Sequence, residues 1–403
     1  MKPDELEVLQ HQIARFEGDP VIQALVANSV KSALVAGPTR RMLLRSMAEA
    51  GLRQLPQVWE EALAACLTAA DEELARTAVA AVRAMPLAKT GISVISPALL
   101  RLATDPARTV ELRIQALAAM PTGLPAVDNS LFDLLLGQVD AESPATQRSA
   151  AASVLSQATL TESQLITLAG ALRKVGPMEL NRLLEAFEVA NAETVGRAMV
   201  AALADSKALS SIRVDLLQQR LKQFPLAVRE SGQVLLRRLD VNPEELAAQL
   251  DAVLAEVRQL GGDVRRGQAI FNSQKTACST CHAMGYLGGR VGPDLTSIGQ
   301  IRTERDLLEA ILHPSASFVR SFEPVMVTTR DQEDYSGVVL SETADELVLA
   351  TGADVTVRLA RHEVIEMRPG TVSVMPAGLN EQLSKQDLAD LVTFLKNTKW
   401  GAE

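Results

Sequence analysis

The sequence has 403 residues and a formal net charge of −9. This acidic balance argues against a nucleic-acid partner, which would need clustered cations to bind phosphates. No run of about twenty apolar residues is present, so we expect no transmembrane segment. Hydrophobic residues make up 47% of the chain but aromatic residues only 3%, so we expect a core of close-packed helices built from Ala, Leu and Val.

Residues 1–260 have a helical pattern almost throughout. Segments of roughly 12 to 18 residues carry apolar side chains at i, i+3, i+4 and i+7, and Pro, Gly or Asp separates them. Three of these segments share a pattern that begins at an arginine. The arginines are Arg76, Arg113 and Arg148, which are 37 and 35 positions apart (113 minus 76, 148 minus 113).

Fainter copies of this pattern open at Arg45, Arg197 and Arg229. A period of this length with two helices per unit resembles HEAT-type repeats, which stack into an α-solenoid. An irregular helical bundle is the alternative. Because no catalytic constellation is visible here, we expect residues 1–260 to form a HEAT-like helical repeat domain that acts as a spacer and docking arm.

Gly261 and Gly262 mark the predicted boundary with a second domain, residues 261–403. Two glycines allow a hinge, but the joint is rigid if the preceding helix packs on the second domain. The sequence leaves both arrangements open.

The most informative stretch of the second domain is C-S-T-C-H, residues 278–282. It follows the C-x-x-C-H pattern for attachment of a c-type haem. Two thiols three positions apart can form thioethers with the two vinyl groups of one porphyrin, and the imidazole of His282 then lies beneath the iron as its proximal ligand. We therefore predict one haem c, bound covalently through Cys278 and Cys281.

Two other functions of this stretch have less support in the sequence. A zinc site would need four ligands, and the third cysteine, Cys66, lies about two hundred positions upstream in a helical pattern. A thioredoxin-like dithiol would follow a buried strand, and no such strand pattern precedes Cys278.

The flanks of the motif carry a resemblance to a known family. Gly267 and Phe271 precede the motif, and Gly292-Pro293-Asp294-Leu295 follows it. From about residue 262 onward the chain resembles class I cytochromes c, specifically the haem-binding domain of large multidomain proteins from planctomycete, verrucomicrobial and related bacteria. The resemblance implies that the glycine lets the C-terminal helix cross closely and that the phenylalanine packs beside the haem. It also implies that the proline carbonyl accepts a hydrogen bond from His282.

Met375 is the predicted sixth ligand of the iron. It lies in a loop, followed by Pro and Gly, ahead of an amphipathic helix at residues 384–397, and this order also resembles the family. A thioether ligand favours reduced iron and raises the potential. The rivals are His313, at a predicted helix end, and His362, beside a predicted strand. We expect each rival to face solvent or cap the backbone.

Residues 325–369 change to an alternating pattern. Five short runs there predict strands that form a small curled sheet or barrel, and the family carries a similar insertion. The insertion would cover one haem edge, shape a docking surface or contribute stability alone. Four cations surround the motif and would hold the haem propionates, guide docking to an acidic partner or serve solubility: Arg265, Arg266, Lys275 and Arg290.

We therefore expect a mainly α fold, with a HEAT-like α-solenoid followed by an all-α cytochrome c domain that carries a small antiparallel β insertion. The expected function is single-electron transfer by a periplasmic cytochrome, with electrons from a redox partner protein or an upstream dehydrogenase domain, so that the chain is an electron carrier rather than an enzyme. Because the family attaches haem outside the cytoplasm, we expect a secretory signal to have preceded this sequence. The alternatives are a haem sensor or enzyme with an open sixth site, and an interaction scaffold.

Overall fold

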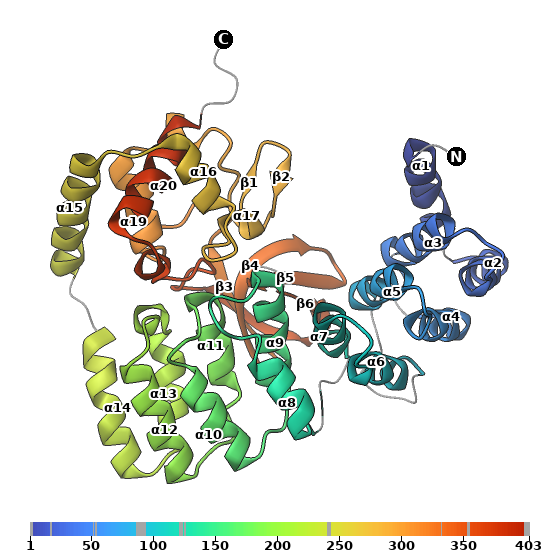
Figure 1. Cartoon of the computed structure of the whole chain (residues 1–403), viewed down its shortest axis with the longest axis horizontal. Coiled ribbons are helices and arrows are strands. Elements are labelled where there is room, and N and C mark those ends of the chain that lie inside the picture. Colours follow the sequence, from blue (N-terminus) through green and yellow to red (C-terminus); the bar gives the residue numbers. More distant parts are fainter. Residues whose placement is uncertain are drawn as a thin grey trace. The chain divides into compact units, whose positions relative to one another are not determined.

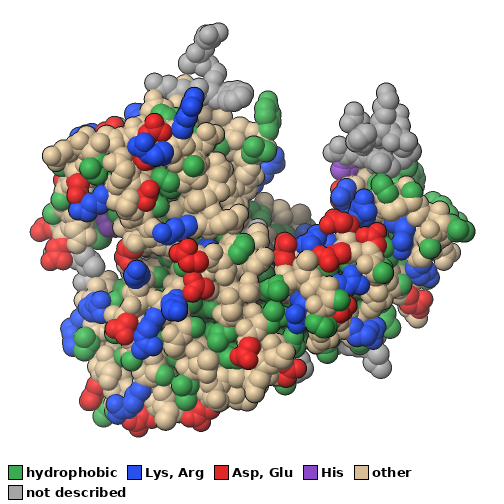
Figure 2. Space-filling view, in the orientation of Figure 1, with side chains coloured by type: hydrophobic (Ala, Val, Ile, Leu, Met, Phe, Trp, Pro, Cys, Tyr) green, Lys and Arg blue, Asp and Glu red, His purple; other side chains and the backbone are tan. Residues whose placement is uncertain are grey.

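A computed structural model of the chain describes residues 3–16, 18–50, 52, 55–85, 94–120, 124, 126–239, 243–331, 333–352 and 355–398 (Figure 1). Helices predominate and are joined by some antiparallel sheet, which confirms the mainly α prediction. Two compact units are present: residues 1–135 with 157–159, and residues 136–156 with 160–403. Within the described ranges, no helix is both long and apolar enough to cross a membrane. Acidic and basic side chains are interspersed on the face shown in Figure 2.

The first unit consists of helices whose alternate members pack on one another. Helix α1 packs on α3, α3 on α5 and α5 on α7, while α2, α4 and α6 form a second row. In α5, Leu74, Ala78 and Val82 recur every four positions and are all buried, and Asp71 caps the helix by accepting from the Leu74 N–H at 3.1 Å. The helices are α1 Pro3–Ala14, α2 Pro20–Lys31, α3 Gly37–Glu49, α4 Gln57–Leu67, α5 Glu72–Ala84, α6 Ile95–Thr104, α7 Val110–Ala118 and α8 Asn129–Leu136.

The second unit begins with helices that follow the same alternation. Helices α10, α12 and α14 pack in one row, and α11 packs on α13. The elements are α9 Ala145–Gln157, α10 Glu162–Ala171, α11 Pro177–Glu185, α12 Glu193–Ala204, the 3-10 turn η1 Leu209–Ser211, α13 Val214–Lys222 and α14 Leu226–Leu239.

An arginine recurs in the odd-numbered helices α3 to α13. The series is Arg40, Arg76, Arg113, Arg148, Arg182 and Arg220, at intervals of 34 to 38 positions (36 from 40 to 76, for example). In α3 and α7 the arginine Nε donates to a carbonyl ten positions earlier, near the end of the preceding helix: Val30 at 2.7 Å and Ala103 at 2.8 Å. Such bonds satisfy carbonyls that a helix end leaves unpaired. The fainter copies expected at Arg45, Arg197 and Arg229 do not share this register, because Arg45 lies five positions after Arg40 in α3 and the other two lie in α12 and α14.

Helix α15, Pro243–Leu260, packs with the C-terminal helices. Its Leu250, Leu254 and Val257 are buried in one apolar core with residues of α16, α19 and α20. The segment before Gly261 is therefore fixed to these helices, so the joint at the two glycines is rigid rather than a hinge. The predicted domain boundary at 260/261 stays a prediction. The remaining helices are α16 Val264–Phe271, α17 Cys278–Cys281, α18 Ile298–Ile301, α19 Glu304–Leu312, the 3-10 turn η3 Leu379–Gln382 and α20 Lys385–Asn397.

Helices α16 and α20 cross at very short range. A Cβ on Gly267 would lie 2.1 Å from the Asp390 carbonyl oxygen, so only glycine permits this crossing. The Phe271 and Phe394 rings pack at 5.7 Å between centroids, with 54° between their planes. The crossing thus brings Phe271 to the wall of a cavity that Cys278 also lines.

The five predicted strands are all observed. They form an antiparallel sheet in the order β6-β5-β4-β3-β7, around the buried side chains of Val327, Leu347, Leu349 and Leu359. The strands are β3 Pro324–Thr329, β4 Asp334–Glu342, β5 Glu346–Gly352, β6 Val355–Ala360 and β7 Val364–Pro369, with the 3-10 turn η2 Arg361–Glu363 before β7. A separate hairpin, β1 Ala283–Met284 and β2 Leu287–Gly288, follows α17.

Candidate functional site

The C-S-T-C-H stretch forms a short helical turn. Ala277 precedes it in the left-handed conformation, with φ 48°, and α17 then runs over Cys278–Cys281. The His282 N–H donates to the Cys278 carbonyl at 3.0 Å, which closes the turn. Both thiols and the imidazole line one cavity as a result.

His282 is held in a defined orientation. Its Nδ1 lies 2.8 Å from the Pro293 carbonyl oxygen, and because a carbonyl only accepts, Nδ1 carries the proton and Nε2 keeps its lone pair. Burial lowers the pKa of His282, which favours the neutral ring that a metal ligand requires. A Cβ on Gly292 would lie 2.5 Å from the ring Cε1, so the loop can cover the ring only with glycine there.

The turn before Cys278 is stabilised by Thr276. The buried Thr276 hydroxyl donates to the Ile270 carbonyl at 2.6 Å and thereby connects the turn to the end of α16. Burial raises the pKa of the Cys278 thiol, so that group stays protonated in an apolar environment. Cys278 also lines the cavity.

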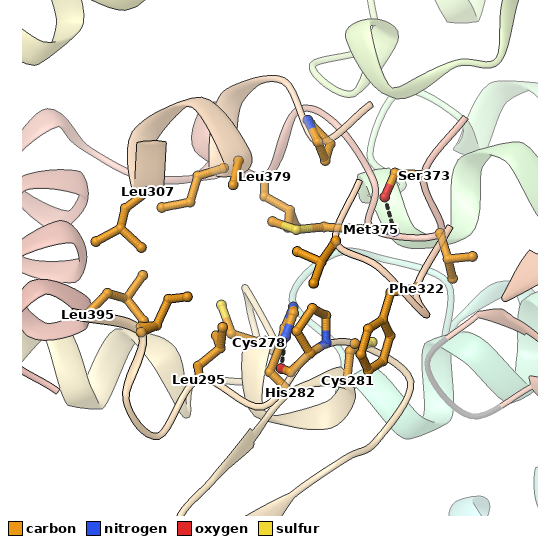
Figure 3. Close-up of a pocket in the computed structure, with 18 of the residues that line it drawn as sticks. Cys278, Cys281, His282, Leu295, Leu307, Phe322, Ser373, Met375, Leu379 and Leu395 are labelled. Carbon is orange, nitrogen blue, oxygen red and sulfur yellow. Dashed lines mark hydrogen bonds between the residues drawn. The ribbon is translucent and has the colours of Figure 1, made fainter. Parts of the chain in front are cut away.

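The cavity has a volume of about 230 Å³. Figure 3 shows Cys278, Cys281 and His282 on one side of it, with Met375 and Leu379 on the facing side. Further apolar walls come from Leu295, Leu307, Phe322 and Leu395. Two thiols that could form thioethers with a porphyrin line this largely apolar cavity, together with an imidazole and a thioether that could ligate iron, so the residues fit a covalently attached haem.

The loop of Met375 is fixed by two serines. The Met375 N–H donates to the Ser373 hydroxyl at 3.1 Å (Figure 3). The Ser373 N–H in turn donates to the Ser315 hydroxyl at 3.0 Å. Gly378 then turns the chain with φ 79° into η3. The thioether therefore belongs to an ordered turn that comes after the sheet.

The two rival histidines do not line the cavity. His313 ends α19, where its N–H donates to the Glu309 carbonyl at 2.7 Å, while its neighbour Pro314 does line the cavity. His362 is exposed in η2. Among the cations around the motif, Arg266 is paired with Asp390, and Arg265, Lys275 and Arg290 are exposed.

Several cavity residues were missed by the sequence reasoning, and three of them come from separate elements. Met178 reaches the cavity from α11, Val338 from β4 and Arg302 from the end of α18. Met178 lies 100 positions before Cys278 in a helical pattern, so no local signal connected it to the motif. Val338 belonged to a strand that was predicted, but the face of the strand that meets the cavity was not.

Comparison with known proteins finds a cytochrome c-type relative. The chain is 30% identical over 74 residues to a cytochrome c-553-like protein of Synechocystis sp.. The match covers 18% of this chain and 67% of that protein. No protein-family model matches the chain. Through this cytochrome c-type region, the chain belongs to the cytochrome c family.

Proposed function

We propose that the chain is an electron carrier that would bind one haem c covalently through Cys278 and Cys281, with His282 and Met375 as the residues that would ligate the iron. One observation carries the proposal: a neutral His282, held by the Pro293 carbonyl beside two thiols, faces Met375 across an apolar cavity. When bound, the haem supplies a one-electron couple.

The residues of the chain account for the remaining requirements of electron transfer. The bond from Nδ1 of His282 to the Pro293 carbonyl orients the ring and raises its basicity. The thioether of Met375 favours the reduced state of the iron. Apolar walls, including Phe271 and Leu307, exclude water, so the charge of the site changes with little rearrangement around it.

The finer assignments belong to the same proposal. The planctomycete and verrucomicrobial haem-binding domain is supported by the glycine crossing of α16 and α20 and by the inserted sheet. HEAT-like stacking is supported by the alternate packing of the helices and the recurring arginine. The periplasmic location and the partner, a redox protein or an upstream dehydrogenase domain, follow from covalent haem attachment and from the family.

The test compares three methionine variants of the haem-loaded protein: Met375→Leu, Met178→Leu and Met284→Leu. Met178 is the other methionine that lines the cavity, and Met284 follows His282 closely in sequence without lining it. The readouts are the weak red-region absorption band of methionine-ligated ferric haem c and the binding of carbon monoxide to the reduced form.

We expect Met375→Leu alone to lose the band and to bind carbon monoxide readily. Loss of the band in Met178→Leu instead would transfer the ligand role to Met178. A wild-type protein that lacks the band and binds carbon monoxide would support an open sixth site, and with it a sensor or enzyme.

A further inference from the structure

Arg148 of α9 is a buried cation with an unusual set of partners. Its side chain is 2% exposed, and its Nε donates to the Glu179 carboxylate of α11 at 3.2 Å. Its Nη1 approaches three carbonyl oxygens: Ala141 at 2.9 Å, Ser143 at 2.7 Å and Gln274 at 3.1 Å. The last of these lies 126 positions away, four residues before Cys278.

The same turn makes a second bond to α9. The Gln274 side-chain oxygen accepts from the Ala145 N–H, at the first residue of α9, at 3.1 Å. Helix α9 therefore holds the turn before Cys278 through both the backbone and the side chain of Gln274. Arg148 Nη2 also lies 3.9 Å from the sulfur of Met178, which lines the cavity.

The segment that follows Met375 is held by the same helical array. The Ser210 hydroxyl of η1 donates to the Glu381 carboxylate at 2.5 Å. A Cβ on Gly378 would lie 2.8 Å from the Ser210 hydroxyl, and a Cβ on Gly176 would lie 3.1 Å from Nε2 of Gln382. Residues 378–382 thus pack directly against residues of the helical array.

Arg148 differs in this respect from its counterparts in α3 and α7. Arg40 and Arg113 each use Nε on a carbonyl ten positions earlier in the chain. Arg148 occupies the same position in the series, but its guanidinium donates to Glu179 and to the Gln274 carbonyl in the turn before Cys278. Glu179 is 1% exposed, and its second oxygen has no hydrogen-bond partner among the described residues. Burying such an ion pair costs desolvation free energy, and moving either partner away would leave a buried charge unpaired. The pair therefore favours a fixed joint.

We infer that the helical array at residues 145–211 holds both sides of the haem cavity in place; we call the cavity the haem crevice and this support the clamp. Arg148 is the positioning residue for the Cys278 turn. Ser210 is the positioning residue for the Met375 segment. The inference rests on the proposed function. The helices then do more than carry the cytochrome: they set the distance between the two sides of the crevice. A loosened clamp leaves the haem attached but allows Met375 to leave the iron more often.

The first test is the double variant Arg148→Met with Glu179→Gln, which removes both charges and so avoids an unpaired buried ion. Its control is Arg220→Met with Glu188→Gln, because Arg220 of α13 is also buried and has no bond to residues 262–403 among those described. A second clamp variant, Ser210→Ala with Glu381→Ala, alters only exposed groups, so we expect it to fold.

The readouts are hydrogen exchange of amides in residues 272–282 and 373–383, and the rate of carbon monoxide binding. In the Arg148 variant we expect at least about tenfold faster exchange in the first segment, and in the Ser210 variant the same in the second. Both should bind carbon monoxide at least about tenfold faster than the wild type, and the control should match the wild type.

Unchanged exchange in both clamp variants would overturn the inference, as would equal acceleration in the control. If the Arg148 variant does not fold, the Ser210 variant decides the outcome. Hydrogen exchange reports on the clamp even where Met375 proves not to be the ligand, so failure of the clamp and failure of the proposed function are distinguishable.

Discussion

Gly292 determines whether the loop after the haem motif can cover His282. An added Cβ at this position would lie 2.5 Å from the ring Cε1 and 2.7 Å from Nδ1, the atom that donates to Pro293. Gly292→Ala should therefore rotate the ring or displace the loop. We expect a loss of about 1 to 3 kcal/mol in unfolding free energy, the usual cost of overpacking, and a lower yield of attached haem.

Chemical denaturation and haem content measured on the same preparations provide the readout for Gly292→Ala. Gly170→Ala is the matched control, since a Cβ there meets nothing within 4 Å. Normal haem content and stability in Gly292→Ala would show that the loop can move away without consequence.

At the scale of the element, Asp390 joins α20 to α16. Its carboxylate is 1% exposed and accepts from Arg266 Nε at 2.6 Å and Nη2 at 2.8 Å, from the Asp263 N–H at 2.7 Å and from Gln386 at 3.0 Å. These hydrogen bonds lower the pKa of Asp390 from 3.8 to about 2, and those from Arg266 are the largest cause. Since the folded pKa lies below the unfolded value, the ionised carboxylate stabilises the fold above about pH 4, and that contribution disappears between about pH 4 and pH 2.

Asp390→Asn should therefore cost about 1 to 2 kcal/mol at pH 7, a range that allows for the exposure of Arg266 to solvent. The difference from the wild type should shrink as the pH falls from about 4 towards 2. Denaturation series at neutral pH and at about pH 4 and pH 3 measure it. Asp251→Asn, which breaks an exposed pair with Arg305, should change stability by less than about 0.5 kcal/mol at every pH. A pH-independent loss in Asp390→Asn would point to packing rather than charge.

The inserted sheet can be removed without breaking the path of the chain. Val325 and Pro369 pair across β3 and β7, and the Gly370 N–H donates to the Pro324 carbonyl at 2.8 Å, so two glycines can replace residues 325–369. Because β4 contributes Val338 to the cavity wall, we expect the shortened chain to retain its haem but to bind carbon monoxide at least about tenfold faster, with a lower reduction potential. Unchanged binding and potential would leave the sheet a role in stability alone. Val338→Ser, which keeps the sheet, separates the effect of the wall from that of the fold.

The sequence predicted those elements whose signal is local. Period-two alternation predicted all five strands within a few residues, and the C-x-x-C-H pattern selected the stretch that the structure folds into α17 and His282. The close crossing of the C-terminal helix at Gly267 was also predicted, but only from the resemblance to a family. The pairing of Arg266 with Asp390 was not, since it joins positions 124 apart that carry no common pattern.

The contacts that the sequence did not predict are those between the N-terminal helices and the cytochrome c-type region. Arg148 was recognised as a member of a repeat, yet its bond to Gln274 spans 126 positions. Helix α15 was grouped with the helices that precede it, and its leucines are buried with α19 and α20 instead. Amphipathic periodicity indicates that one face of a helix is buried, but it does not indicate which element packs against that face.

The distribution of charge on the chain also affects how a charged reactant approaches the haem motif, and this effect can be tested. The net charge is −9, and acidic and basic side chains are interspersed on the face seen in Figure 2. Lys275 and Arg290 are exposed beside the motif, whereas Arg266 is committed to Asp390. Lys275 and Arg290 are therefore well placed to attract an anionic reactant to the haem.

The variant Lys275→Gln with Arg290→Gln should slow oxidation of the reduced protein by ferricyanide about two- to fivefold at low salt, because local positive potential raises the encounter rate of an anion. Stopped-flow rates at about 0.01 M and 0.15 M salt test this, since screening shortens the Debye length from about 30 Å to about 8 Å and should remove most of the difference. Arg101→Gln with Lys207→Gln removes the same charge at exposed positions elsewhere and should leave the rate within error of the wild type. Equal slowing in both variants would assign the effect to net charge, and no slowing in either would leave Lys275 and Arg290 a role in solubility only.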